Sequence, residues 1–151
     1  MTPTAPRHWP TPPGEWPEWL WSVKYVGGRH PGSADVGTVA EGANCQLYAY
    51  AVLDLFGRRP RPHRSSELWA DPSYDHPQRD AAEPLDLVLF NDTDTAWGAH
   101  VALQMGPDEL LHLCSSEKTP VVWPFGRFAA DPRYRHLIGV VRIPDPGSGP
   151  S

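Results

Sequence analysis

The clearest periodic pattern in the chain predicts an amphipathic helix from Cys45 to Phe56. Its apolar side chains recur at the spacing that brings them to one helix face, at Leu47, Tyr48, Ala51, Val52, Leu55 and Phe56. Asn44 precedes the pattern and can cap the first turn, because its side-chain oxygen accepts from free backbone N–H groups. Gly57 follows it and suits the left-handed conformation that ends many helices. Cys45 is therefore expected on the first turn.

Beyond this helix, the pattern changes to short strands. A second helix is expected at Ser66–Ala70, followed by a polar, proline-interrupted loop. Apolar and β-branched residues between turn signals then predict five strands, at Leu85–Phe90, Ala99–Met105, Glu109–Cys114, Pro120–Trp123 and Leu137–Ile143. A helix followed by hairpin-connected strands predicts an α+β fold, with the helix packed on an antiparallel sheet.

The hairpin between the second and third strands places two histidines on one face. With a turn at residues 106–108, two residues face each other across the hairpin when their residue numbers add up to 214. If the pairing shifts by one pair in either direction, this sum changes but stays even, so the same residues share a face. His100 and His112 then lie on the same face, opposite or diagonal to each other. In these registers, the two side chains are close enough to share a hydrogen bond.

Proline divides the chain into a domain and two tails. Of its 19 prolines, six fall within residues 1–17 and three within residues 144–151. Because proline fixes φ and lacks an N–H donor, we expect an N-terminal tail at 1–17, a folded domain at 18–143 and a C-terminal tail at 144–151. The N-terminal segment is rich in tryptophan, and we favour its docking on the domain over a partner-binding or substrate-lining strip.

Composition narrows the class of partner. The chain has 151 residues, enough for one domain, and 13 Lys and Arg against 18 Asp and Glu give a net charge of -5. Because the net charge is negative, we expect no nucleic-acid partner. The sequence contains no apolar run of 18 residues, so we expect no membrane partner either. No apolar Sec signal follows Met1, so we expect a cytoplasmic protein, with export by another route left open. The oligomeric state stays open.

The two cysteines, Cys45 and Cys114, are expected as thiols. A thiol on a helix's first turn feels the positive end of the helix dipole, which favours the nucleophilic thiolate. Covalent acyl transfer needs a nucleophile, a base and a group that orients the base, and Cys45, His100 and His112 can fill these roles. The alternatives are a buried structural thiol with two ordinary sheet histidines, or a zinc site, which the lack of close ligand pairs disfavours. Cys114 is expected to be structural.

Several segments resemble those of the NlpC/P60 cysteine peptidases, a branch of the papain-like fold. Asn44-Cys45-Gln46 before an apolar helix resembles the nucleophile helix of the family, and Arg64-Ser65-Ser66 resembles its Arg-Thr-Ser segment. Residues 83–90 are similar to its Pro-Gly-Asp-Leu-Val-Phe-Phe strand. His100-Val101-Ala102-Leu103 with Leu111-His112 is similar to its His-Val-Gly-Ile and Ile-His-Ala pair. The resemblance implies a papain-like fold with Cys45 as nucleophile, His100 as base and His112 as third polar member.

The chain also departs from the family pattern at the expected substrate-binding residues. The family usually has Asp-Cys-Ser-Gly at the nucleophile, whereas Asn44 and Gln46 flank Cys45 here. Loss of the carboxylate removes a charge-assisted partner for the ammonium group of a cell-wall peptide. The Tyr-x-Trp-Gly-Gly segment of the family corresponds loosely to residues 25–28, which makes Tyr25 a further substrate-binding candidate.

The resemblance and the residues together predict a thiol hydrolase, a peptidase or amidase. It would cleave an amide bond in a small peptide, with peptidoglycan as one source, through an acyl-enzyme on Cys45. It would need no metal and no organic cofactor, and the backbone N–H of Cys45 would stabilise the oxyanion. A transacylase or amide-forming enzyme with the same triad is the first alternative, since both share the first half-reaction. A catalytically silent binding module is the second.

Overall fold

The structure is a computed structural model of the chain and describes residues 4–146; residues 1–3 and 147–151, parts of the two expected tails, lie outside the described residues. Its α-helices are α1 (Cys45–Asp54), α2 (Ser65–Ala70) and α3 (Phe125–Ala129), and its 3-10 helices are η1 (Glu18–Trp21), η2 (Val36–Glu41) and η3 (Arg79–Ala81). Its strands are β1 (Leu87–Asn91), β2 (His100–Gly106), β3 (Glu109–His112), β4 (Val121–Trp123) and β5 (His136–Val141). Within residues 4–146, no helix has the length and apolar character needed to cross a membrane.

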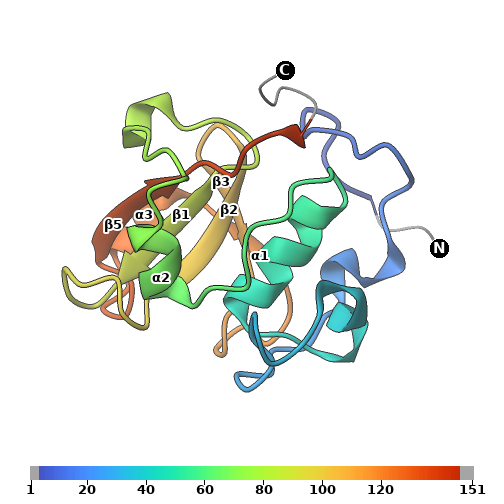
Figure 1. Cartoon of the computed structure of the whole chain (residues 1–151), viewed down its shortest axis with the longest axis horizontal. Helices are drawn as coiled ribbons and strands as arrows, with labels where there is room; N and C mark the ends of the chain where they lie inside the picture. Colours follow the sequence, from blue (N-terminus) through green and yellow to red (C-terminus); the bar gives the residue numbers. More distant parts are fainter. Residues whose placement is uncertain (1–3, 147–151) are drawn as a thin grey trace.

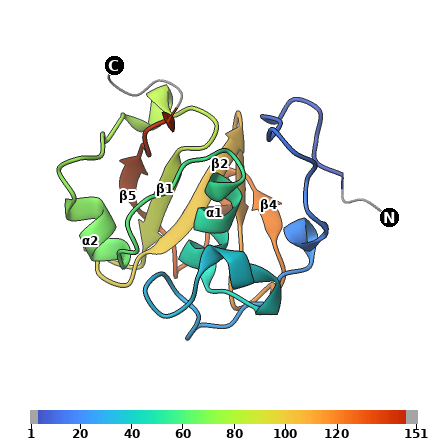
Figure 2. The ribbon, with the colours of Figure 1, turned by 45° about the vertical axis from the view of Figure 1, so that its right-hand side comes forward.

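The strands form one antiparallel sheet in the order β4-β3-β2-β1-β5. Figure 1 shows this sheet beside α1, and Figure 2 shows α1 in front of the central strands. The expected α+β fold is therefore confirmed, and each strand begins and ends within two residues of its expected bounds. β1 begins at Leu87 rather than Leu85, because Leu85 has a left-handed backbone with φ 77° that interrupts the extended conformation.

The β2–β3 hairpin has the expected register. Leu103 lies opposite Leu111 and Gln104 opposite Leu110, so facing numbers sum to 214 as predicted. A bulge at the turn end then pairs Gly106 with Glu109, and Asp108 takes a left-handed conformation with φ 53°. This register places His100 and His112 on the same face of the sheet, in diagonal positions.

Helix α1 begins and ends through the caps that the sequence indicates. The Asn44 side chain accepts a hydrogen bond from the Leu47 N–H at 2.8 Å. Gly57 has φ 75°, and the next N–H, of Arg58, donates to the Leu53 carbonyl at 3.1 Å. The helix is not amphipathic, however, since all its residues from Gln46 to Leu53 are buried. The sheet covers one side, while η2 and the N-terminal segment cover the other (Figure 1).

The sheet has two different faces because alternate strand residues point to opposite sides. One face packs on α1 through side chains such as Leu89, Val101 and Leu103. The other packs on α3 and the loop after it, and its core contains Val88, Phe90, Ala102, Leu110, Cys114, Trp123, Phe128, Tyr134 and Val140. Helix α3 was not expected from the sequence, because five residues beginning Phe-Gly are too short to show a helical period.

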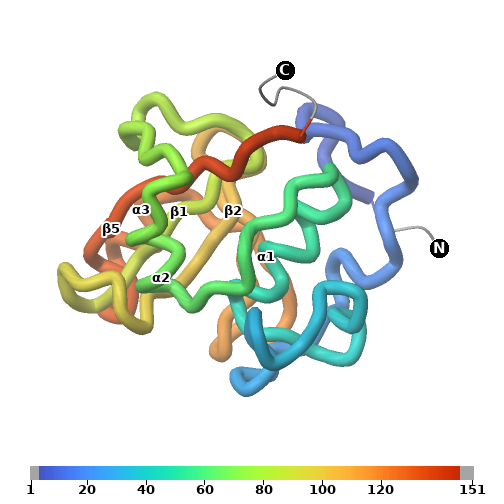
Figure 3. Tube along the Cα trace, viewed as in Figure 1, coloured from blue at the N-terminus to red at the C-terminus, as the bar shows by residue number. Residues whose placement is uncertain are grey.

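The described part of the N-terminal segment, residues 4–17, contains no helix or strand and is docked on the body (Figure 3). Trp9 is only 4% exposed, and its ring packs against Trp16 and Trp21 with centroids 6.4 and 5.8 Å apart. Nε2 of His8 lies 2.6 Å from the Glu109 carboxylate at the start of β3. Trp9 therefore contributes to the hydrophobic core even though the expected domain boundary lies at residue 18.

Candidate active site

Cys45 lies where the first turn of α1 meets β2. Its side chain is partly exposed, and the backbone N–H of Val101 donates a hydrogen bond to its sulfur, as do the N–H groups of Gln46 and of Cys45 itself. Because Val101 directly follows His100, this contact brings the sulfur to the part of β2 that carries the first histidine. The helix start and the strand start thus meet at one point.

His100 and His112 form the expected pair. Nε2 of His100 lies 2.9 Å from Nδ1 of His112, and the two rings are nearly perpendicular with centroids 5.0 Å apart. This bond occupies Nε2 of His100 and leaves its Nδ1 as the nitrogen that can exchange a proton. Trp123 and Phe128 pack on the His112 ring, with centroids 4.4 and 4.7 Å away. His112 therefore holds the His100 ring through a neutral contact, fixed in turn by aromatic packing.

Tyr134 stacks on the His100 ring, a contact that the sequence did not predict. The two centroids are 4.5 Å apart and the planes differ by 28°. The Arg133 guanidinium lies 4.7 Å from the Tyr134 ring centroid and is held by the Asp131 carboxylate at 2.7 Å. Tyr134 comes from the loop between α3 and β5, far along the chain from both motifs. An aromatic residue after a turn carries no pattern that would indicate this role.

A pocket of about 280 Å³ brings most of the sequence candidates together. It is lined by Tyr25, Gly27, Asn44, Cys45, Gln46, Arg64, Ser65, Gly98, Ala99, His100 and Tyr134. His112 lies behind His100 and is only 1% exposed. A larger hollow, of about 770 Å³, lies elsewhere, between η3, α3 and the β2–β3 turn, and neither cysteine nor histidine lines it. The smaller pocket is therefore the one with nucleophilic chemistry.

Burial sets the protonation state of the pocket. It raises the pKa of the Cys45 thiol to about 11, and the N–H groups that donate to the sulfur oppose this shift without cancelling it. Desolvation also lowers the pKa of His100 to about 3, assisted by the positive charge of Arg133. The N–H groups at the helix start favour the thiolate, as expected, but loss of hydration outweighs them, so the expectation of a thiolate at Cys45 is wrong for the free protein. Thiol and imidazole are both neutral at pH 7.

The three expected substrate-binding residues all line the pocket, but two of them use side-chain atoms in hydrogen bonds within the protein. The Asn44 oxygen caps α1. The buried Gln46 amide donates both to the Tyr50 hydroxyl and to the His63 carbonyl, each at 2.8 Å. Gln46 therefore ties α1 to the linker before α2. Tyr25 keeps its side chain in the pocket wall, while its backbone pairs with Ala43 in a parallel bridge.

Ser65, the first residue of α2, fixes the loop that leads to His100. Its hydroxyl donates to the Ala96 carbonyl at 2.9 Å and accepts from the Ala99 N–H at 3.0 Å. The Asn91 amide donates to the Thr95 and Trp97 carbonyls of the same loop. The loop backbone is thus held from both sides, while the Trp97 side chain is 78% exposed.

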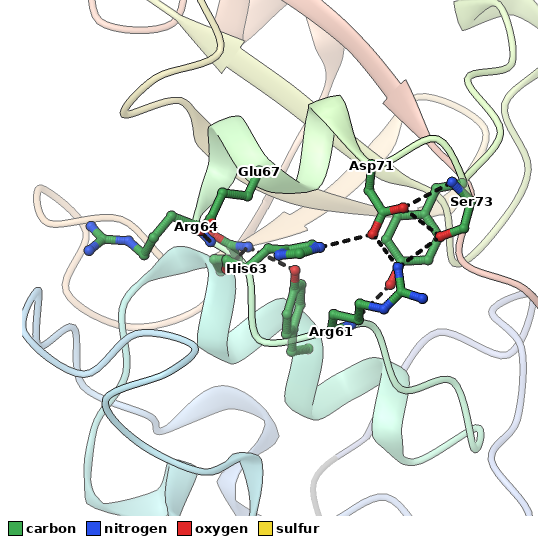
Figure 4. A network of polar contacts seen from close by, with 9 residues as sticks. Arg61, His63, Arg64, Glu67, Asp71 and Ser73 are labelled. Atoms are coloured by element: carbon green, nitrogen blue, oxygen red, sulfur yellow. Dashed lines mark hydrogen bonds and ion pairs between the residues drawn. The ribbon is translucent and has the colours of Figure 1, made fainter.

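A polar network at the far end of α2 anchors the preceding linker (Figure 4). The Asp71 carboxylate accepts from Arg61 at 2.7 Å, from His63 at 2.9 Å and from the Ser73 N–H at 2.9 Å. These contacts, the Ser73 bonds first among them, hold the pKa of Asp71 well below its usual range. Since the His63 carbonyl accepts from Gln46, the network holds the residue next to the nucleophile.

Cys114 lies in the core on the α3 side, with its sulfur 3.4 Å from the Ser116 hydroxyl. Both cysteines are free thiols in the structure. Within the described residues, no group of three or more His, Cys, Asp or Glu side chains is arranged to hold a metal ion.

Comparison with known proteins supports the fold. No family model matches the sequence, and no curated protein matches it. Among solved structures, an NlpC/P60 family protein from Bacillus cereus is similar, with a TM-score of 0.56 and 15% sequence identity. The match covers 79% of this chain but only 36% of that one, so this chain spans about a third of its length. The chain has the α+β fold of an NlpC/P60 protein, as the resemblance of its motifs implied.

Proposed function

We propose that the protein is a thiol hydrolase that cleaves an amide bond in a small peptide through an acyl-enzyme on Cys45. The observation that carries this proposal is the shared pocket of Cys45 and His100, in which the sulfur accepts from the backbone directly after His100. A nucleophile, a base and a second imidazole that holds the base are the parts such chemistry requires. The NlpC/P60 fold supports a peptidase or amidase.

The neutral pocket favours proton transfer during attack over a preformed ion pair. The Cys45 sulfur bonds to the carbonyl carbon as its proton moves to Nδ1 of His100, whose Nε2–H donates to His112. The C–N bond then breaks, and the leaving amine takes the proton. Water then attacks the thioester carbon as one of its protons moves to Nδ1 of His100. The C–S bond breaks, which releases the carboxylic acid, and the proton returns from His100 to the sulfur. Once the sulfur is bonded to carbon it is a weak acceptor, so the backbone N–H of Cys45 that donates to it in the free protein can stabilise the oxyanion instead.

The test compares the native protein with Cys45→Ala, and with Cys114→Ala as the matched control, on a panel of peptide amides. Native protein and the Cys114 variant should hydrolyse the same amides and form an adduct at Cys45 detectable by mass spectrometry. Cys45→Ala should do neither, and His100→Ala should be slower by about 10²- to 10⁴-fold, the usual contribution of a general base. Equal turnover by native protein and Cys45→Ala would contradict the proposal.

One observation favours a catalytically silent binding module instead, namely the high pKa that burial gives the Cys45 thiol. In that case, the native protein would hydrolyse no amide and Cys45 would react with alkylating reagents no faster than buried Cys114. The same panel, supplemented with amine acceptors, separates hydrolysis from acyl transfer, because only transfer yields new conjugates.

A further inference from the structure

The proposed reaction creates a positive charge on a ring that has no carboxylate partner in the pocket. When the Cys45 proton moves to Nδ1, the buried His100 imidazole becomes an imidazolium. Among the described residues that line the pocket, none is Asp or Glu. His112 accepts the Nε2–H as a neutral imidazole, and its own Nε2 has no hydrogen-bond partner within residues 4–146. The charge must therefore be stabilised by a group other than a carboxylate of the pocket.

The Tyr134 ring lies where it can stabilise this charge. Its centroid is 4.5 Å from the His100 ring centroid and the two planes differ by 28°, so the imidazole stacks on the face of the phenol ring. That face carries the negative charge density of the π electrons and attracts a cation within about 6 Å of the centroid. Both side chains are buried, so little water screens the contact. The attraction is strong for an imidazolium and weak for a neutral imidazole.

The turn before Tyr134 holds this ring in place. The Tyr134 N–H donates to the Asp131 carbonyl at 2.9 Å, and the Arg133 N–H donates to the Asp131 carboxylate at 3.0 Å. The Arg133 guanidinium, 4.7 Å from the Tyr134 ring centroid, is a cation that contacts the same π electrons. The Asp131 carboxylate accepts from its Nε at 3.0 Å and from its Nη2 at 2.7 Å. Because this pairing balances the charge of Arg133, the ring remains able to stabilise a cation at His100.

The ring makes this contact without help from the hydroxyl group. Within residues 4–146, the Tyr134 hydroxyl has no hydrogen-bond partner. Phenylalanine at this position would keep the π electrons that face His100, whereas leucine would remove them. The two substitutions therefore separate the ring from the hydroxyl.

We propose that Tyr134 is a positioning residue that stabilises the imidazolium form of His100 through the face of its ring. This inference rests on the proposed function, because the imidazolium forms when His100 takes the Cys45 proton. In that step the S–H bond breaks, an N–H bond forms at Nδ1, and negative charge moves through the new S–C bond to the carbonyl oxygen. Because the neutral imidazole gains little from the ring, the contact stabilises the transition state more than the ground state and raises kcat.

The experiment measures kcat and KM of native protein, Tyr134→Phe and Tyr134→Leu on a peptide amide that the native protein hydrolyses. Tyr134→Phe should keep kcat within about twofold of native. Tyr134→Leu should lower kcat about 5- to 30-fold, the usual effect of losing a desolvated cation–π contact, with the loss in kcat rather than in KM. Both half-reactions form the imidazolium, so kcat reports the contact whichever of the two limits the rate.

A series of fluorinated rings separates the charge effect from packing. Phenylalanines that carry increasing numbers of ring fluorines are incorporated at residue 134, where they keep a ring of nearly the same size. Since each fluorine withdraws π electron density from the ring face, kcat should fall stepwise as fluorines are added. The matched control is the same series at Phe90, whose ring stacks on Phe128 with centroids 4.3 Å apart, and it should leave kcat unchanged. A ring that acts by packing alone would show no such order.

The outcomes separate this inference from the proposed function. If the native protein hydrolyses no amide, the proposed function is wrong, and the inference falls with it. If the native protein is active but kcat is the same across the fluorinated series at residue 134, the inference is wrong and the proposed function stands. This comparison holds even where Tyr134→Leu fails to fold. A stepwise loss of kcat at residue 134, with none at Phe90, supports the inference.

Discussion

At the scale of the residue, two opposing effects determine the state of Cys45. Three backbone N–H groups donate to its sulfur, which stabilises the thiolate, while burial removes the water that would solvate that charge. Burial is the larger effect, so the thiol is neutral. Burial also lowers the pKa of His100, so its imidazole is neutral as well. The ring faces His112 from β3 and the side chains of Tyr134, Arg133 and Asp131 from the loop before β5. The pair is therefore poised for proton transfer from sulfur to imidazole.

This state predicts the pH dependence of Cys45 alkylation by iodoacetamide. The folded-state pKa of the thiol, about 11, lies above its usual value, so the thiolate fraction is small at neutral pH and grows as pH rises toward that value. The rate should increase steadily from pH 6 to pH 10, as followed by mass spectrometry of the peptide that contains Cys45. A rate that is already constant above pH 5 would indicate a thiolate–imidazolium pair and contradict this prediction.

At the scale of the element, β5 is held against α2 by a close approach that requires glycine. Gly139 lies in the middle of β5 with φ 153°, and a Cβ built there would lie 2.3 Å from the Trp69 ring. The Trp69 ring cannot easily yield, because it stacks on His76 with centroids 3.9 Å apart. This packing sets the position of α2, whose first residue, Ser65, fixes the loop before His100.

Gly139→Ala should therefore destabilise the protein, by about 1–3 kcal/mol as for other overpacked sites, measured by urea unfolding. Gly126→Ala in α3 is the matched control, because a Cβ there meets no atom within 4 Å. Alanine favours helix over glycine, so the control should be neutral or more stable by up to about 1 kcal/mol. If the two substitutions changed the free energy of unfolding equally, the close contact between Gly139 and Trp69 would not be what makes Gly139→Ala destabilising.

At the scale of the whole molecule, the central helix is enclosed by parts of the chain far apart in sequence. The sheet lies on one side of α1 and the segment containing Trp9 on the other (Figure 1). The contact between His8 and Glu109 joins that segment to the edge of the β2–β3 hairpin. The N-terminal segment is therefore expected to contribute to the stability of the whole fold.

Trp9→Ala should cost about 3–5 kcal/mol, the usual effect of removing a buried aromatic side chain, which is a large fraction of the total stability of a small domain. Trp97→Ala is the matched control, since Trp97 is 78% exposed, and should change stability by less than about 0.5 kcal/mol. Both values come from the free energy of unfolding in urea. A Trp9 variant as stable as the native protein would mean that the segment packs without contributing to stability.

Local signals predicted the features that depend on local geometry. The Asn44 cap, the five strands and the diagonal histidine pair follow from side-chain period and turn length, which act over a few residues. Tyr134 stacked on His100 and Trp9 in the core depend on contacts between distant segments, for which the sequence has no periodic signal. The Cys45 thiol pKa was predicted in the wrong direction because the sequence reveals the helix start but not the depth of burial around it.

The two-residue alternation of β2 and β3 limits how this hairpin can vary in length. A one-residue slip of β3 along β2 would exchange His112 with Leu111, move the imidazole to the α1 side and separate it from His100. A slip of two residues would keep its direction. Insertions and deletions that shift this strand are thus compatible with the paired imidazoles only in even numbers, a parity rule that any redesign of the turn must obey.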